Sequence, residues 1–398
     1  MVHPRTLARV ALRVAVAPVV LALWLVRRRV RLVFVLPNVT LFGHLALEPE
    51  KHLARRRRTP DRRPRVLDVW AFGRRRERAN AALTRMWRRR VTWLPAPLAD
   101  AMHRVAALLP GPGMPVVDFD KLHENDDVLD DGPSFLRPTR SEDRALARYL
   151  DSVGIAPGLP YACIVVRDAR FAPASSGPHA SGPLRSRSFE DFLPAARLLA
   201  DLGVPVVKVG SRGTFDARGL HPRIVDYANG GATDPLLDVM LPARATTVVS
   251  TMSGPDAVAL AAHRPVLYVD LVQYSLCFAG TALTTWVPAL LCDATGRVLT
   301  LREVFDSGAG RILGEDGFAR QGLEIRRSSP AQIAAYVRDH VQRVTGGAAV
   351  DPRVEALQDR YRETYRELMS RGSVRPLGAF RSRLADGFVR SRGAEFLA

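Results

Sequence analysis

Residues 248–270 read VVSTMSGPDAVALAAHRPVLYVD. The stretch begins and ends on apolar runs, and an Ala-rich segment lies between them. Short apolar runs of this kind are typical of strands buried on both faces, and the Ala-rich segment favours a helix. We therefore expect a strand at 246–249, a helix at 255–263 and a strand at 266–269, the repeating unit of a parallel sheet. A cluster of Ser, Thr, Gly and Pro lies between the end of the first strand and the start of the helix.

The same alternation of strands and helices runs along most of the chain. Further strands are expected at 31–37, 65–72, 91–94, 114–119, 161–166, 204–209 and 224–227. Further helices are expected at 43–54, 77–89, 97–109, 141–152, 188–203 and 236–244. This pattern predicts an α/β fold in which helices cover both faces of parallel sheets. It restarts after an Asp-, Pro- and Gly-rich segment at 121–138, so we expect two Rossmann-like lobes.

The pattern divides the chain into four segments. We expect an N-terminal helix in residues 1–30, a first lobe in 31–140, a second lobe in 141–330 and a C-terminal helical extension in 331–398. Helices of the extension are predicted at 331–344, 352–371 and 380–392. With 398 residues, 47% of them apolar, the chain is long enough for two such cores.

The excess of basic over acidic residues is confined to the N-terminal part of the chain. The net charge is +18, from 58 basic and 40 acidic residues, and residues 1–90 hold 23 of the basic and 5 of the acidic ones. An excess of this size indicates nucleic acid or anionic lipid as a partner. No module of interleaved aromatic and basic residues accompanies the charge, so we do not expect nucleic acid binding.

The N-terminal apolar run favours lipid. It reads VAVAPVVLALWLV at 14–26, is interrupted by Pro18 and is followed by Arg27, Arg28 and Arg29. About thirteen residues are fewer than the roughly twenty that a spanning helix needs. We expect an interfacial helix that binds anionic headgroups at the inner face of the plasma membrane. A tilted membrane anchor and a helix buried in the fold remain alternatives.

The cysteines and the missing motifs narrow the chemistry. Three cysteines, far apart in the sequence, imply neither disulfides nor a zinc site, which fits a reducing cytoplasm. Neither a G-x-G-x-x-G motif, a Walker A loop nor a G-x-S-x-G elbow is present. Asp118 and Asp120 form a D-x-D pattern that holds a divalent cation in some sugar transferases, but the rest of the architecture does not suit a metal-dependent transferase. We expect neither a metal nor a cofactor.

Ligands of open α/β sheets bind beyond the carboxyl ends of the strands. The polar residues at those ends are therefore the candidates for a binding site. They are Arg167, Asp168, Lys208, Gly210, Asp226, Tyr227, and the loop from Ser250 to Asp256.

The loop after the strand at 246–249 is suited to a phosphate. The first backbone N–H groups of a helix attract anions, and Ser250, Thr251 and Ser253 add hydroxyl groups. Gly254 allows a close approach of the backbone. Asp256 would repel a phosphate, so we assign it to the helix cap or to a sugar hydroxyl. The alternative is that the whole loop only caps the helix.

Arginine and histidine side chains supply further candidates. Arg167 ends an apolar strand, and its guanidinium can bind a diphosphate through two nitrogens. An ion pair with Asp168 is the alternative. Arg185 and Arg187 precede a helix and are further candidates for substrate contacts. His44 lies at the start of the first lobe's first helix, either as a general base toward an acceptor or as a capping or core histidine.

The order of these elements resembles a family of bacterial glycosyltransferases found with cell-surface polysaccharide genes. Segments such as FGHLALEPE, DVWAFG, CIVVRD and VSTMSGPDAV carry the resemblance. The matching segments are 42–50, 68–73, 80–87, 163–168, 206–210, 224–228, 236–241, 249–258 and 264–270.

The resemblance implies a GT-B fold, with an acceptor lobe first and a nucleotide-sugar donor lobe second. It implies a hexosyl- or deoxyhexosyltransferase whose partners are a nucleoside diphosphate sugar and a saccharide or lipid-linked acceptor. Arg167 looks like the arginine of the His-x-Arg element of fucosyltransferase-type enzymes, which holds the donor diphosphate. Val165 stands where that histidine would be, and residues 184–188 read LRSRS where the family tends to have a different run. A nucleotide-sugar epimerase and a non-catalytic, basic membrane-binding paralogue remain alternatives.

Overall fold

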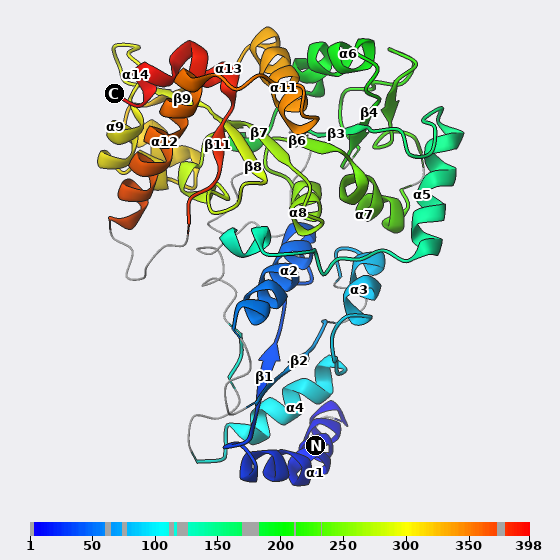
Figure 1. The fold of residues 1–398 in the computed structure, drawn as a ribbon. Coiled ribbons are helices and arrows are strands. Elements are labelled where there is room, and N and C mark those ends of the chain that lie inside the picture. Colours follow the sequence, from blue (N-terminus) through cyan, green and yellow to red (C-terminus); the bar gives the residue numbers. More distant parts are fainter. Residues whose placement is uncertain are drawn as a thin grey trace. The chain divides into compact units, whose positions relative to one another are not determined.

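The computed structural model describes residues 4–398, except for 60–64, 74–77, 111–114, 118–125, 169–182, 211, 232 and 372–378. The chain forms two compact units (Figure 1). Unit 1 comprises Met1–His123 and Phe135–Arg137, and unit 2 comprises Glu124–Ser134 and Pro138–Ala398. The helices of 331–398, which the sequence pattern set apart as an extension, lie within unit 2.

Unit 1 is built around a short parallel sheet. Its elements are α1 (Pro4–Leu25), β1 (Val30–Val35), α2 (Phe42–Arg58), β2 (Arg65–Trp70), α3 (Ala81–Arg88) and α4 (Ala96–Ala106). Strands β1 and β2 pair in parallel, as predicted. The strands expected at 91–94 and 114–119 are represented by bridges from Trp93 to Trp70 and from Val116 to Phe34. Residues 118–119 lie outside the described residues.

Helix α1 is longer than the sequence pattern predicted. It spans 22 residues and includes Pro18, whereas the apolar run alone suggested about thirteen. The helix begins at Pro4, because proline is favoured in the first turn of a helix, where its missing N–H costs nothing. The segment Thr6–Leu25 has a mean hydropathy of 1.9 and is long and apolar enough to cross a membrane by length and composition. The expectation that this segment is too short to span was therefore wrong.

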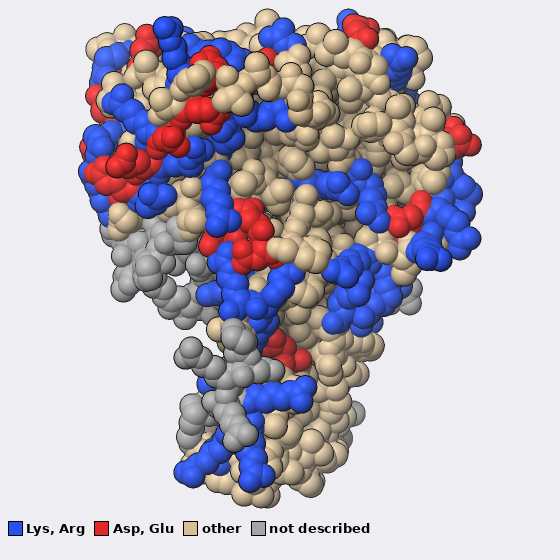
Figure 2. All heavy atoms as spheres, in the orientation of Figure 1, with Lys and Arg blue, Asp and Glu red and all other residues tan. Residues whose placement is uncertain are grey.

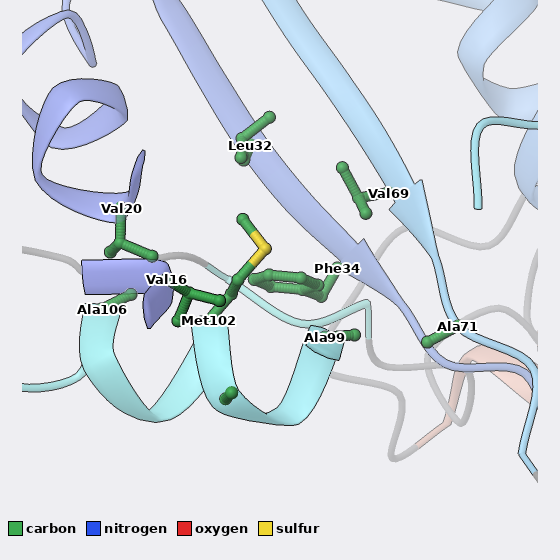
Figure 3. Packing of buried hydrophobic residues seen from close by; sticks show 10 residues of the cluster. Val16, Val20, Leu32, Phe34, Val69, Ala71, Ala99, Met102 and Ala106 are labelled. Carbon is green, nitrogen blue, oxygen red and sulfur yellow. The ribbon is translucent and has the colours of Figure 1, made fainter. Parts of the chain in front are cut away.

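The core of unit 1 joins α1 to the sheet through α4. Figure 3 shows Val16 and Val20 of α1 gathered with Met102 of α4 and Phe34 of β1. The side chains of Val20 and Phe34 are almost completely buried. One side of α1 is thus part of the fold of unit 1.

Unit 2 contains a sheet of seven parallel strands in the order β11-β8-β7-β6-β3-β4-β5. The strands are β3 (Ala162–Val165), β4 (Val206–Val209), β5 (Ile224–Asp226), β6 (Thr247–Ser250), β7 (Val266–Leu271), β8 (Thr284–Pro288) and β11 (Arg383–Leu384). The chain runs outward from β3 to β5, returns to β6 on the other side of β3, and continues to β8. This is the Rossmann strand order, whose topological switch point lies between β3 and β6.

Helices cover both faces of this sheet. Figure 1 shows α6 and α11 on one side of the sheet and α7 and α8 on the other. The main helices are α5 (Arg140–Ser152), α6 (Leu193–Asp201), α7 (Pro235–Arg244), α8 (Gly254–Ala261), α9 (Leu301–Asp306), α10 (Glu315–Arg320), α11 (Pro330–Val344) and α12 (Pro352–Ser370). Short 3-10 helices are η3 (Asp126–Asp130), η4 (Pro183–Arg185), η5 (Phe189–Phe192), η6 (Tyr274–Leu276) and η7 (Ala309–Arg311). Asp234 caps α7 as expected, accepting a hydrogen bond from the backbone N–H of Leu236.

The C-terminal region differs from the prediction. The helix expected at 380–392 is confirmed only in its second half: strand β11 occupies Arg383–Leu384, and the chain is helical from Asp386 onward, as α13 (Asp386–Phe388), the π-helix η8 (Val389–Gly393) and α14 (Ala394–Phe396). Gln358 of α12 holds β11 in place, since its Oε1 accepts a hydrogen bond from the backbone N–H of Leu384. Strand β8 and the antiparallel pair β9 (Leu290–Cys292) and β10 (Glu324–Arg326) were not predicted.

Candidate functional site

The switch point brings together two of the predicted site segments. Val165 at the end of β3 is paired with Ser250 at the end of β6. Just beyond, the backbone N–H of Arg167 donates to the hydroxyl of Thr251 over 3.0 Å, and the N–H of Thr251 donates to the carbonyl of Val165 over 3.2 Å. The residues after β3 and β6 are therefore joined where ligands bind in open α/β sheets.

A second arginine reaches the same loop. Nη1 of Arg185 donates to the carbonyl of Met252 over 3.4 Å. The segment that follows Arg185 runs beside the residues just beyond β3, because Ser186 forms a parallel β-bridge with Arg167 and the N–H of Arg187 donates to the Arg167 carbonyl over 2.9 Å. Of the two loop arginines considered from the sequence, the structure places Arg185 beside the switch point.

The pKa values of both arginines are lowered. Burial lowers the pKa of Arg167. Burial, followed by the positive charge of Arg167, lowers the pKa of Arg185 to about 10, and the charge of Asp256 partly opposes this shift. Two positive charges thus lie in surroundings that disfavour the charged form of arginine. A bound anion would raise both pKa values again.

Asp256 organises the loop between β6 and α8 from within. Its buried carboxylate accepts hydrogen bonds from the Ser250 hydroxyl over 2.6 Å, from the Tyr268 hydroxyl over 3.2 Å and from the backbone N–H of Ser253. Burial raises the pKa of Asp256 to about 6, although these hydrogen bonds lower it. Asp256 therefore has the capping role, one of the two that the sequence allowed, and the Ser250 hydroxyl donates to Asp256 instead of facing a ligand.

The remaining loop residues have different surroundings. Thr251 is buried, and its hydroxyl holds Arg167, whereas Ser253 and Gly254 are half-buried at the first turn of α8. Met252 adopts a left-handed backbone conformation with φ 66°, which costs about 1–2 kcal/mol in a residue other than glycine. Strain of this kind concentrates at functional loops, where the surrounding structure enforces it.

Lys208 and Asp226 form a buried ion pair at the ends of β4 and β5. The ammonium nitrogen of Lys208 lies 2.9 Å from Oδ2 of Asp226 and donates to the carbonyl of Phe215 over 2.6 Å. Asp226 also accepts from the N–H of Ala217 over 2.8 Å. The pair therefore fastens the loop that follows β4. Gly210 begins this loop with φ 113°, a conformation that favours glycine.

The other polar residues near these strand ends also hold protein segments. Asp168 accepts hydrogen bonds from the N–H and hydroxyl of Thr214, over 2.8 and 2.6 Å. Arg187 forms ion pairs with Asp191 and Asp270. Asp168, Arg187 and Lys208 line a small cavity of about 10 Å³, far below the roughly 300–1,000 Å³ of typical ligand pockets.

In unit 1, His44 is paired with a carboxylate. Its Nδ1 lies 2.6 Å from Oε1 of Glu48, one helical turn further along α2. The His44 side chain is 38% exposed and that of Glu48 is 8% exposed. Glu48 is itself fixed, because Oε2 accepts from the N–H of Asn38 over 2.9 Å. If Nδ1 carries the proton toward Glu48, Nε2 is left as the acceptor that a general base needs.

Glu48 was not among the residues predicted from the sequence, although its spacing of four residues from His44 was the available signal. The rest of α2 is fastened by a second carboxylate. Asp68 of β2 lies 2.7 Å from Nε2 of His52 and is bound by two nitrogens of Arg56. Burial would raise the pKa of Asp68, but the hydrogen bonds from His52 and Arg56 outweigh it and hold the pKa below its usual value. The helix that carries His44 is therefore rigidly attached to the sheet.

Asp118 and Asp120, the pair considered for a cation, lie outside the described residues. Within the residues that the structure describes, no group of three or more His, Cys, Asp or Glu side chains is arranged to hold a metal ion.

No family model and no curated protein sequence matches this chain. Among solved structures, the glycosyl transferase family 9 protein from Veillonella parvula is 10% identical, covers 78% of this chain and 97% of its own, and gives a TM-score of 0.47. The E. coli ADP-heptose LPS heptosyltransferase II is 15% identical over 60% of this chain and 84% of its own, with a TM-score of 0.35. The E. coli heptosyltransferase WaaC with ADP is 12% identical over 65% of this chain and 91% of its own, with a TM-score of 0.34. These similarities are too distant to assign a family or a function.

Proposed function

We propose that the protein is a GT-B glycosyltransferase that moves a sugar from a nucleoside diphosphate donor to a saccharide or lipid-linked acceptor. One observation carries the proposal. Arg167 is buried, and its backbone N–H donates to the hydroxyl of Thr251 in the strained loop at the switch point of a Rossmann-type sheet. The half-buried Arg185 lies beside the same loop, where its guanidinium donates to the carbonyl of Met252. This is a site for an anion with several oxygens, and arginine is the side chain best suited to bind a diphosphate.

The proposed reaction gives each of these groups a task. An acceptor hydroxyl oxygen bonds to the anomeric carbon of the sugar, and the bond from that carbon to the diphosphate breaks. The electron pair of the broken bond goes to the leaving phosphate oxygen, where negative charge grows. Arg167, Arg185 and the N-terminus of α8 stabilise this charge, so the proposed reaction needs no metal.

The proton of the acceptor hydroxyl needs a base, and His44 is our candidate. Glu48 supports this role, because a carboxylate at Nδ1 orients the imidazole and stabilises the positive charge that forms when Nε2 takes up the proton. Glu48 would then be a positioning residue. Its loss is expected to reduce the rate of transfer without changing donor affinity.

The first experiment measures sugar transfer and donor hydrolysis with a panel of UDP-, GDP-, CDP- and ADP-sugars. Arg167→Ala is expected to slow the reaction by about 10²–10³-fold, the effect of removing one donor to a developing oxyanion. Arg218→Ala is the matched control, because Arg218 forms an exposed ion pair with Asp216 in the same unit. Near-full activity of folded Arg167→Ala would remove Arg167 from this role. Analysis of products formed without acceptor separates a transferase from an epimerase.

A second experiment examines the histidine. His44→Gln is expected to slow transfer by about 10²–10⁴-fold, the usual contribution of a general base, and to leave nucleotide affinity unchanged. Glu48→Gln should give a smaller loss of the same kind, because glutamine can still orient the imidazole but does not stabilise its positive charge. Full transfer activity of His44→Gln would assign proton removal to another group.

A further inference from the structure

Helix α1 carries an exposed apolar stripe. Leu7, Val10, Val14, Leu21 and Leu25 are between 46% and 68% exposed. Their spacings of three, four and seven residues place them along one side of the helix, one above the other. A row of five large apolar side chains on the surface is more than a soluble monomer normally leaves in water, and such patches mark interaction sites.

The other side of α1 packs against the rest of unit 1. Val16 and Val20 are buried against α4 and β1, as Figure 3 shows. Counted at 100° per residue, these two side chains lie on average about 135° around the helix from the stripe. The helix is therefore fixed to unit 1 by one face and presents the stripe outward by the other.

Polar and aromatic groups next to the stripe fit a lipid interface. Arg27, Arg28 and Arg29 follow the helix and are exposed. Trp24 donates from Nε1 to the carbonyl of Pro110 over 2.9 Å, and the guanidinium of Arg27 lies 3.9 Å from the centre of the indole ring. Tryptophan and arginine are the residues that gather at the level of lipid headgroups. Figure 2 shows Lys and Arg bordering the uncharged surface at the end of unit 1 that carries α1.

We propose that α1 lies along the surface of an anionic bilayer, with the stripe in the acyl-chain boundary and Arg27–Arg29 against the lipid phosphates. The proposal is independent of the reaction proposed above. It differs from a spanning helix, although the length of α1 would permit one. A spanning orientation would detach Val16 and Val20 from their core and place Arg9 and Arg13 in hydrocarbon, which is costly. A second copy of this chain paired with the stripe in a parallel orientation would bring two runs of three arginines together, which like charges oppose.

The test is co-sedimentation of the full chain with vesicles of phosphatidylcholine containing one third phosphatidylglycerol. Val14→Glu and Leu21→Glu are expected to weaken binding by at least about tenfold each, because a carboxylate cannot enter the acyl-chain boundary. Leu202→Glu is the matched control, since Leu202 is 58% exposed on unit 2; this variant should bind like the unaltered chain. Replacing Arg27, Arg28 and Arg29 by serine should weaken binding to anionic vesicles and reduce its dependence on salt.

Three results would overturn the proposal. The first is unchanged vesicle binding by Val14→Glu. The second is a dimer that forms without lipid and is lost in Val14→Glu, because a second copy would then cover the stripe. The third is resistance of the membrane-bound chain to alkaline carbonate, which releases surface-bound proteins and retains spanning ones. Nucleotide affinity, measured on the same variants, should stay unchanged, so that a failure here is distinct from a failure of the proposed reaction.

Discussion

Two charged clusters lie at the carboxyl edge of the same parallel sheet, and their charges are arranged differently. The switch-point cluster consists of Arg167, Arg185 and the loop from Ser250 to Gly254. The brace consists of Lys208 and Asp226, with opposite charges 2.9 Å apart. Both clusters follow buried strands, so the rule that ligands bind beyond the carboxyl ends of parallel strands does not distinguish them. Their position at a strand end therefore does not distinguish the two clusters, but the balance of their charges does.

In the brace a cation is paired with an anion, whereas in the switch-point cluster burial, together with the charge of one cation, Arg167, lowers the pKa of another, Arg185. Asp226 faces the ammonium group of Lys208 and several backbone N–H groups, which is the pattern of a structural fastener. In the switch-point cluster, burial and the neighbouring Arg167 lower the pKa of Arg185 to about 10. An anion bound beside Arg167 and Arg185 would raise the pKa values of both arginines and would pair with them as Asp226 pairs with Lys208 in the brace.

The largest expected effect is on the brace. Asp226→Ala should lower the free energy of unfolding by about 3–5 kcal/mol, because it leaves the buried ammonium of Lys208 without its carboxylate. Denaturant titration measures this loss. Asp216→Ala, which breaks an exposed ion pair, should leave the free energy of unfolding almost unchanged. Unchanged stability of Asp226→Ala with loss of nucleotide binding would make Asp226 a ligand residue and erase the distinction between the clusters.

A smaller effect is expected where β3 and β6 are joined. Thr251→Val removes the oxygen that accepts from the buried N–H of Arg167 and should cost about 1–3 kcal/mol of stability. It should also weaken nucleotide binding, because Arg167 loses its fixed position. Thr251→Ser keeps the acceptor and serves as the control. Equal stability and affinity of the valine and serine variants would show that this hydrogen bond does not position the site.

The smallest expected effect is a dependence on pH. Because burial raises the pKa of Asp256 to about 6, its negative charge beside Arg185 is lost as the pH falls from 7.5 to 5.5. Affinity for a nucleotide sugar, whose esterified phosphates do not titrate in this range, should therefore rise a few-fold. The same raised pKa makes the contribution of Asp256 to stability greatest below pH 4, and this contribution is lost as the pH rises through about 6. Asp256→Asn should flatten both profiles, and a persistent profile in that variant would assign the titration to another group.

The strands of unit 2 could be predicted from the sequence where they are continuous apolar runs. Strands β3 to β7 are short apolar stretches bounded by turns and were predicted within a few residues. Strand β8 was missed because TTWVP is short and rich in hydroxyl groups, although all five residues are buried. Strand β11 was missed because two residues pair only through the packing of α12, which no local pattern reveals. The length of α1 was underestimated because Arg9 and Arg13 mask its first turns.

The site was readable only in part. Arg167 and the loop from Ser250 follow strands, and parallel strands bring their carboxyl ends to one edge. The position of Arg185 depends on a segment that returns beside Arg167, just beyond β3, and no sequence pattern favoured Arg185 over Arg187. The bond between Ser250 and Asp256 spans six residues and depends on the turn at Met252. Pairing of Lys208 with Asp226 requires that β4 and β5 be neighbours, so it became visible only with the strand order.

The most direct test of the central claim is calorimetric titration of the protein with UDP, GDP, CDP and ADP. Binding of at least one of these nucleotides is expected. Arg167→Ala and Arg185→Ala should each weaken it by about tenfold or more, the effect of removing a hydrogen bond to a charged group. Arg218→Ala should bind like the unaltered protein. Absence of binding by all four nucleotides, or binding that both arginine variants retain in full, would contradict a diphosphate site at the switch point between β3 and β6.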